Sequence, residues 1–341
     1  MKNGDSEKIG MSDHWRGKKV LVTGGSGFIG SHVVDRLVSL GAQVTATVFQ
    51  DPVNLSNLDH VKDKIRMSVV DLTRLDDCME VCQGQEVVFS IAHADGSVAF
   101  KRDRTAYILR QNMLITLNML EAASRHRVER FLVTSSAEVY PHDSPVPTLE
   151  EQAFTKSDRL SDGYTWSKRM SEMAARIWTH EHPLQIAIAR PNNIYGPRDY
   201  FDEGRGRVIP MFIKNAVDEE KPIVIWGDGG AIRSFLYVED LARGLVDLVE
   251  KYPECDAVNF GSDEEIALRD LAELVIRLSG SKVKVICDTT KPAGAPKRTT
   301  DIHKAQQLLG FRPSVSLETG LARTLEAYKK QLGARAQVAS R

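Results

Sequence analysis

KKVLVTGGSGFIG, residues 18–30, is the stretch that decides the fold of this chain. Residues 18–23 predict a buried strand, and residues 31–40 place apolar side chains at helical spacing. A glycine-rich turn between a first strand and a first helix binds the pyrophosphate of a dinucleotide, because the helix N-terminus presents free N–H groups and a positive dipole end. Its spacing is G-x-x-G-x-x-G, and the candidate cofactor-binding residues are Gly24, Gly27, Phe28, Ile29 and Gly30.

Each glycine of this turn has a separate task. Gly24 permits the tight turn, and Gly27 lets the backbone approach the phosphates. Gly30 lets the helix pack closely on the strand. A turn that holds no ligand is the alternative, and the strand–turn–helix context at the start of the fold favours the dinucleotide.

Strands and helices alternate along the first 190 residues. Further strand-like runs lie at 43–49, 65–70, 86–92, 130–135 and 185–190, with helical stretches between them. This alternation predicts an α/β fold with a doubly wound, parallel Rossmann sheet covered on both faces. After a polar segment rich in Gly and Pro at 191–210 come shorter elements, including 222–226, 256–260 and 268–279. They predict a smaller, mixed α/β C-terminal lobe.

The domain boundaries follow from these patterns. Residues 1–16 are polar and are expected to form a flexible tail, and residues 17–190 form the dinucleotide-binding domain. Residues 191–332 form the second lobe, which is interleaved with the first domain because the strand at 185–190 returns to the main sheet. Residues 333–341 are expected to be a second tail.

Composition excludes several classes of protein. The 341 residues hold 45 Lys+Arg and 46 Asp+Glu, a balance that argues against nucleic-acid binding. No apolar run is long enough for a membrane helix, and residues 1–16 lack the apolar core of a signal peptide. Four cysteines are too few for a disulfide scaffold, so we expect a cytoplasmic protein, and no His or Cys spacing indicates a metal site.

The residues that would select the cofactor lie after the second and third strands. An acid that holds the ribose 2′-hydroxyl is expected at the end of the second strand, where this chain has Val48, and Asp51 comes later. No Lys or Arg is placed for a 2′-phosphate, so NAD is expected, with NADP as the alternative. Asp71, beside Leu72, could accept a hydrogen bond from the adenine amino group, cap the helix expected at 73–82, or do both.

Tyr164 and Lys168 are the candidate catalytic pair. They are four residues apart and therefore neighbours on one helix face, where an ammonium lowers the pKa of a phenol. Ser136 follows the strand at 130–135, and parallel strands bind ligands at their carboxyl ends. Ser136 can therefore hold the substrate hydroxyl that Tyr164 deprotonates.

Two helices indicate an oligomer. Residues 105–123 are apolar around most of the helix, and residues 164–178 carry large apolar side chains. A helix with so little polar face is buried on two sides. We expect a homodimer through these helices, with covering loops as the monomeric alternative.

The motifs TGGSGFIG, TSSAEVY and YTWSK resemble those of the extended short-chain dehydrogenase/reductase family. More narrowly, the chain is similar to the NAD-dependent epimerases and dehydratases that act on nucleotide sugars. The resemblance implies an NAD(P) cofactor, a nucleotide diphosphate sugar bound by the C-terminal lobe, and a dimer built on a four-helix bundle. It assigns Ser136, Tyr164 and Lys168 as the catalytic triad and Asn112 as a cofactor-side residue, or else as the site of an internal helix hydrogen bond.

The C-terminal half resembles the GDP-sugar branch of the family, which holds the GDP-fucose synthases and GDP-mannose 3,5-epimerases. The resemblance implies that Arg233 and Arg298 contact the diphosphate and that Asn193 contacts the substrate. Each Arg could instead belong to a surface ion pair. An Arg fork matches phosphate oxygens well.

Some residues depart from that branch. Enzymes that epimerise C3 and C5 carry a Cys two residues after the serine and a His or Lys before the Ile-Pro pair, where this chain has Glu138 and Arg207-Val208. Ser-Ala-Glu instead resembles dehydratases and decarboxylases, which implies an acid–base role for Glu138. His93 is either a residue near the nicotinamide or sugar or a loop histidine.

These observations predict an enzyme that oxidises a sugar hydroxyl at C4, with a GDP-sugar as the expected substrate. The expected outcome is C4 epimerisation through a 4-keto sugar. The alternatives are 4,6-dehydration with Glu138 and reduction of a keto sugar. A dinucleotide sensor without turnover is the alternative from another class, and the Tyr/Lys pair argues against it.

Overall fold

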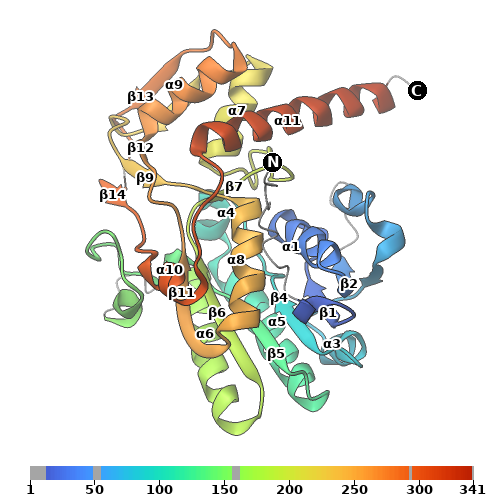
Figure 1. The fold of residues 1–341 in the computed structure, drawn as a ribbon. Helices are drawn as coiled ribbons and strands as arrows, with labels where there is room; N and C mark the ends of the chain where they lie inside the picture. The colour runs from blue at the N-terminus through green and yellow to red at the C-terminus, as the bar shows by residue number, and fades with distance from the viewer. Residues whose placement is uncertain (1–12, 49–54, 156–161, 292–293, 340–341) are drawn as a thin grey trace, which may run out of the picture.

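A seven-stranded sheet forms the centre of the computed structural model, which describes residues 13–48, 55–155, 162–291 and 294–339 (Figure 1). Its strand order is β11-β6-β5-β4-β1-β2-β3, and every pairing is parallel. The strands are β1 (Lys19–Thr23), β2 (Gln43–Val48), β3 (Arg66–Val69), β4 (Val87–Ser90), β5 (Arg130–Thr134), β6 (Gln185–Pro191) and β11 (Glu254–Phe260). The parallel α/β fold predicted from the sequence is confirmed.

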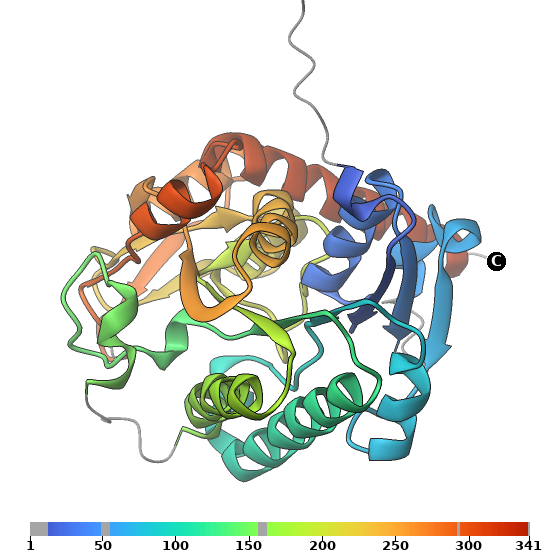
Figure 2. The same ribbon diagram turned by 60° about the horizontal axis from the view of Figure 1, so that its bottom comes forward.

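Helices cover both faces of the sheet (Figure 2). One face packs against α1 (Phe28–Ser39), α8 (Val238–Lys251) and α10 (His303–Leu309). The other packs against α3 (Leu75–Cys82), α5 (Thr105–Arg125) and α6 (Gly163–Glu181), with α5 and α6 side by side. Near-continuous apolar strands such as 20–22 are buried because each of their faces meets a helical layer.

The second lobe has its own core, which includes Ile213, Leu271 and Leu321. Its elements are β7 (Ile194–Tyr195), α7 (Val208–Asp218), β8 (Ile223–Trp226), β9 (Ile232–Ser234), β10 (Leu236–Tyr237), β12 (Glu265–Ala267), α9 (Leu268–Ser279), β13 (Val285–Asp288), β14 (Lys297–Arg298) and α11 (Leu317–Ala339). The remaining helices are α4 (Val98–Asp103) and the short 3-10 helices η1 (Asp13–Trp15), η2 (Ser56–Leu58), η3 (Lys62–Lys64), η4 (Ala137–Val139) and η5 (Glu150–Phe154).

The two lobes share chain segments. Strand β11 and helix α8 come from the range 191–332 but belong to the layers of the main sheet. The predicted tails are shorter than expected. Trp15 is fully buried and its indole Nε1 donates to Glu250 Oε2 at 2.8 Å, and α11 continues past residue 332 to Ala339. Burying an indole whose N–H is hydrogen-bonded favours an ordered start at residue 13.

Candidate active site

The glycine-rich turn connects β1 to the N-terminus of α1. Gly24 has φ +64°, a conformation that L side chains rarely adopt. A Cβ on Gly30 would lie 2.1 Å from the Gly24 carbonyl oxygen, so helix and turn pack as closely as predicted. Gly27 is the N-cap of α1. Because glycine has no side chain, it does not cap the first N–H groups of the helix. These features fit the pyrophosphate of a dinucleotide.

The adenine-side candidates lie at the carboxyl end of the adjoining strands. Asp71 Oδ1 accepts hydrogen bonds from Thr73 N and Thr73 Oγ1, and those bonds lower the pKa of Asp71. The N-cap of α3 is Arg74, so the capping interpretation of Asp71 was wrong: its bonds close the turn before the helix. Leu72 is buried beside it. Residues 49–54, which follow Val48, lie outside the described residues.

The structure brings Tyr164, Lys168 and Ser136 together at the carboxyl end of β5. Tyr164 and Lys168 lie on the first turns of α6, whose N-cap Asp162 accepts from the N–H groups of Tyr164 and Thr165. Lys168 Nζ donates to the Thr134 carbonyl at 2.8 Å and lies 5.6 Å from the centre of the Tyr164 ring. Ser136 lies close enough to Tyr164 for its side chain to act on the pKa of the Tyr164 hydroxyl.

Burial controls the protonation of this pair. It raises the pKa of Tyr164 well above its ordinary value, and the nearby Asp95 carboxylate adds to the rise, whereas the nearby Ser136 side chain opposes it. Burial also lowers the pKa of Lys168 to about 8. Both shifts have the sign expected when the charged form of a group is removed from water.

His93, Asp95 and Lys101, which follow β4, form a charged cluster beside Tyr164. Of these three, only His93 was a candidate residue in the sequence. The Lys101 ammonium lies 4.1 Å from the centre of the Tyr164 ring and 2.9 Å from Asp95 Oδ1. The ring centres of His93 and Tyr164 are 6.2 Å apart. Burial would raise the pKa of Asp95, but the nearby His93 side chain and the charge of Lys101 hold that pKa well below its ordinary value. The sequence offered only one indication of Asp95 and Lys101: both residues follow a predicted parallel strand, and such strands bind ligands at their carboxyl ends.

The segment after β7 covers the same site. Arg207, just before α7, donates to the buried Asp199 at 2.8 Å, and its charge acts on Tyr164. Its guanidinium also lies 5.3 Å from the centre of the Phe28 ring in the glycine-rich turn. Asp199 Oδ2 is buried and has no hydrogen-bond partner among the residues that the structure describes. The position where the sequence lacks the His or Lys of 3,5-epimerases is therefore occupied by a guanidinium at the active site.

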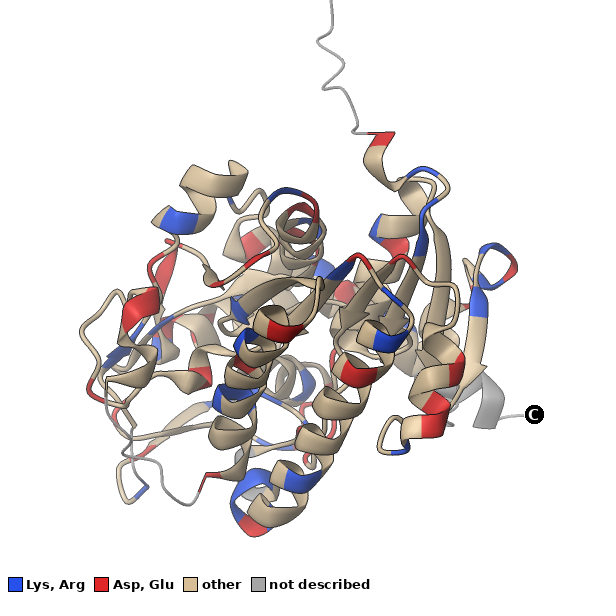
Figure 3. Ribbon diagram, turned by 90° about the horizontal axis from the view of Figure 1, so that it is seen from below, with Lys and Arg blue, Asp and Glu red and all other residues tan. Residues whose placement is uncertain are grey.

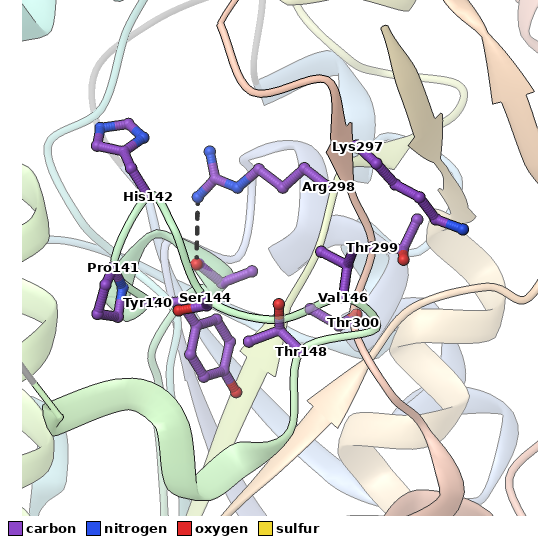
Figure 4. Close-up of a pocket in the computed structure, with 11 residues that line it drawn as sticks. Tyr140, Pro141, His142, Ser144, Val146, Thr148, Lys297, Arg298, Thr299 and Thr300 are labelled. Atoms are coloured by element: carbon purple, nitrogen blue, oxygen red, sulfur yellow. Dashed lines mark hydrogen bonds between the residues drawn. The ribbon is translucent and has the colours of Figure 1, made fainter.

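Glu138 and Arg298 meet beside this centre. Arg298 Nη1 donates to Glu138 Oε1 at 3.1 Å, and Nη2 donates to the Ala137 carbonyl at 3.3 Å. Figure 4 shows Arg298 reaching from β14 over a pocket towards the loop that carries His142. Arg233 is paired with Arg298 in the register of β9 and β14. Two guanidinium groups thus lie at one end of the site.

The two predicted asparagines hold loops in place. Asn112 Oδ1 accepts from Ala94 N at 2.6 Å, and its Nδ2 donates to Ser167 Oγ at 3.1 Å, so it links the segment after β4 to α6. These bonds are not the helix-internal contact that was the alternative. Asn193 Nδ2 donates to the Ser234 carbonyl at 3.0 Å and so connects the β6–β7 turn to β9.

A buried ion pair between Arg190 and Glu172 lies next to the strand end that carries Ser136. Arg190 makes two bonds to Glu172, at 2.8 and 2.7 Å, and both side chains are inaccessible to solvent. Ser135, next to Ser136, donates to Glu172 Oε1 at 2.5 Å. The pair therefore fixes the end of β5 against α6 and β6. Arg190 and Glu172 had no recognisable spacing in the sequence.

Comparison with known proteins decides the family. The model described as "NAD dependent epimerase/dehydratase family" matches residues 20–261. The protein is a member of this family. As an epimerase/dehydratase it is an NAD(P)-dependent enzyme of nucleotide-sugar chemistry, as the sequence predicted.

Three similar proteins indicate the range of this family. A dTDP-4-dehydro-6-deoxy-D-allose reductase from Streptomyces sp is 34% identical over 93% of this chain and 98% of the relative. GDP-L-fucose synthase 1 from Arabidopsis thaliana is 30% identical over 96% and 97%. The crystal structure of UDP-glucose 4-epimerase from Thermotoga maritima, with UDP-glucose, covers 92% of this chain and 99% of its own at 28% identity and a TM-score of 0.83. Within the described residues, no helix has the length and apolar character needed to cross a membrane.

Proposed function

We propose that this enzyme transfers hydride at C4 of a nucleotide diphosphate sugar and that its net reaction is the reduction of a 4-keto sugar. The observation that carries the proposal is the contact of Tyr164 with Ser136 beside Lys168 at the carboxyl end of β5. The nicotinamide of a bound NAD(P)H would supply the hydride. Tyr164 donates a proton to the C4 oxygen, Ser136 holds that oxygen, and Lys168 stabilises the resulting phenolate.

The surroundings of Glu138 favour reduction over dehydration. A dehydratase needs a free acid–base group beside the sugar ring, but Arg298 holds the Glu138 carboxylate in a hydrogen-bonded ion pair. Residue 137, between Ser136 and Glu138, is an alanine and supplies no second acid. The similarity to a 4-dehydro sugar reductase over almost the whole chain agrees with this proposal.

Epimerisation at C4, the outcome expected from the sequence, is the second candidate. The similarity of the fold to a UDP-glucose 4-epimerase favours it. It needs the same three side chains, because the C4 hydroxyl is first oxidised and the keto sugar is then reduced from its other face. The two reactions differ in whether the enzyme keeps its cofactor and in whether the keto sugar turns its other face to that cofactor between two hydride transfers.

The substrate's diphosphate is assigned to Arg233 and Arg298. Both lie at the end of the site, and burial together with the charge of Arg298 lowers the pKa of Arg233, as expected for cations held close together. An anion between them would remove this repulsion. The names of the similar proteins contain dTDP-, GDP- and UDP-sugars. The proposal therefore assigns the diphosphate alone to the two arginines. Which nucleotide is bound is left to an experiment, with GDP as the one expected from the sequence.

We further propose a homodimer through α5 and α6. Between Arg110 and Glu121, α5 carries no charged residue, and Figure 3 shows this part of the helix as a long uncharged stretch. The outer faces of α5 and α6 expose large apolar side chains, which are Tyr107, Leu117, Met170, Met173 and Ile177. Two copies of this helix pair would bury them in a four-helix bundle.

A panel experiment tests the proposed reaction. The enzyme is incubated with dTDP-, GDP- and UDP-sugars and their 4-keto forms, with NADH or NADPH, and products are analysed by mass and NMR. A gain of two hydrogens identifies the reductase, an isomer of unchanged mass the epimerase, and the loss of one water the dehydratase. Tyr164→Phe is the control, and it should lower any of these rates by about 10²–10⁴-fold. Products formed equally by Tyr164→Phe would contradict the proposed chemistry.

A further inference from the structure

Tyr164 has two lysines near its ring, and the Tyr-x-x-x-Lys spacing accounts for only one of them. Lys168 Nζ lies 5.6 Å from the ring centre, and Lys101 Nζ lies 4.1 Å from it. Lys101 belongs to α4, which follows the segment after β4, so it reaches the ring from a different element. The nearer ammonium is therefore the one that the motif does not contain.

Lys101 is held by a carboxylate that is itself anchored. Its Nζ lies 2.9 Å from Asp95 Oδ1, and Asp95 Oδ2 lies 3.7 Å from His93 Nε2. The other nitrogen of His93 is 2.7 Å from the Ile91 carbonyl at the end of β4. A chain of contacts thus runs from the sheet to the ammonium over the Tyr164 ring. This chain keeps one cation and one anion close to the same phenol.

We propose that Lys101 and Asp95 are positioning residues that set the proton affinity of the Tyr164 hydroxyl in opposite directions. A cation beside the ring stabilises the phenolate, and a carboxylate destabilises it. The proposal deepens the proposed function and rests on it for the catalytic consequence alone. In reduction, Tyr164 must hold its proton at working pH and release it to the sugar, so the balance of this pair decides how readily the proton leaves.

Several other groups face Tyr164, and each has a second partner. They are His93 after β4, Ser136 and Glu138 at η4, Lys168 on α6 and Arg207 before α7. Lys168 bonds the Thr134 carbonyl, Glu138 bonds Arg298, and Arg207 bonds Asp199. Burial, and next the charge of Lys168, lower the pKa of His93. Lys101 and Asp95 form an ion pair with each other. Replacing one or the other therefore removes a single charge, positive or negative, from the surroundings of Tyr164.

A direct titration tests the pair without any substrate. Tyr164 is replaced by a fluorinated tyrosine, and its pKa is followed by ¹⁹F NMR in the full-length, cofactor-free protein. Lys101→Met should raise this pKa by about 1 unit, and Asp95→Asn should lower it by about 1 unit. Lys101→Arg, which keeps the charge, should restore the original value. Arg102→Met is the matched control, because it removes a cation from the same helix, one that pairs with the exposed Asp103.

The outcomes separate this inference from the proposed function. Opposite shifts for Lys101→Met and Asp95→Asn support the pair. Equal values for Lys101→Met and Arg102→Met, or shifts of one sign for both variants, overturn it, because general loosening would produce one sign. If a sugar is reduced but the titration shows no shift, the proposed function stands and this inference fails. If no sugar of the panel reacts, the titration still decides whether the pair acts on Tyr164.

Discussion

Glu138 and Arg298 are 160 residues apart in the chain, yet their side chains form a hydrogen-bonded ion pair of 3.1 Å at the candidate active site. Their sequence-derived roles were separate, an acid–base group for one and a diphosphate ligand for the other. The pairing changes both roles. Glu138 holds Arg298 in place, and in the proposed function a diphosphate would bind an arginine that already has a partner.

We expect Glu138→Gln to retain most of the reductase or epimerase activity, because Tyr164, Lys168 and Ser136 supply the proton chemistry.

Arg298→Met should raise KM for the nucleotide sugar about tenfold, since a charge-assisted hydrogen bond to the diphosphate is lost. Steady-state kinetics measure both effects. Lys297→Met is the control, because Lys297 is the neighbouring cation and pairs with Glu265 instead. A Glu138→Gln enzyme that accumulates bound NADH and releases no product would identify a dehydratase.

Substitutions at Gly27 and at Gly30 should have different effects, one on cofactor binding and the other on stability. A Cβ on Gly30 meets the Gly24 carbonyl oxygen at 2.1 Å, so Gly30→Ala should destabilise the protein by about 3 kcal/mol. A Cβ on Gly27 lies 3.2 Å from that oxygen, and Gly27→Val should fold but lose dinucleotide binding, because the branched side chain blocks the backbone's approach to the pyrophosphate. Thermal unfolding and cofactor titration measure the two effects. Normal cofactor affinity in Gly27→Val would show that the turn has another purpose.

The apolar face of α5 and α6 should decide the oligomeric state. Ile177 is 52% exposed in the single chain, so Ile177→Asp would place a carboxylate in the proposed helix bundle and should yield monomers. Light scattering at micromolar concentration reports the mass. Ile286→Asp is the control, because Ile286 on β13 is 46% exposed but lies in the other lobe. A monomeric wild-type protein would rule out the dimer.

The pKa of Lys168 predicts a pH dependence of stability. Burial lowers that pKa to about 8, against 10.5 for a free lysine, so the unfolded chain binds more protons between these values. The contribution of Lys168 to the free energy of unfolding should therefore rise with pH across this window, by about 3 kcal/mol in total, and stay constant below it. Urea unfolding of the wild type and Lys168→Met at pH 7 and 10 gives the difference. The exposed lysine variant Lys329→Met is the control, and a difference for Lys168→Met that does not change with pH would contradict the prediction.

The sequence by itself determined the features that depend on residues close together in the chain. The glycine turn, the alternation of strands and helices, and the Tyr164–Lys168 spacing all follow from local periodicity, because strands and helices repeat every 2 and 3.6 residues. Helix α9 was predicted at 268–279, the bounds it has in the structure. The parallel sheet followed from the same signals, whereas the family followed from the resemblance of the motifs TGGSGFIG, TSSAEVY and YTWSK.

Only the tertiary structure decided which distant side chains meet. Lys101 over Tyr164, Arg298 on Glu138, and Arg190 on Glu172 each join segments that no period relates. A single parallel sheet brings the carboxyl ends of its strands to one edge, so the loops after β4 and β5 converge there. Which of their charges pair depends on loop conformation and burial. The sequence therefore predicted a candidate catalytic pair, and the folded chain determined the charges around it.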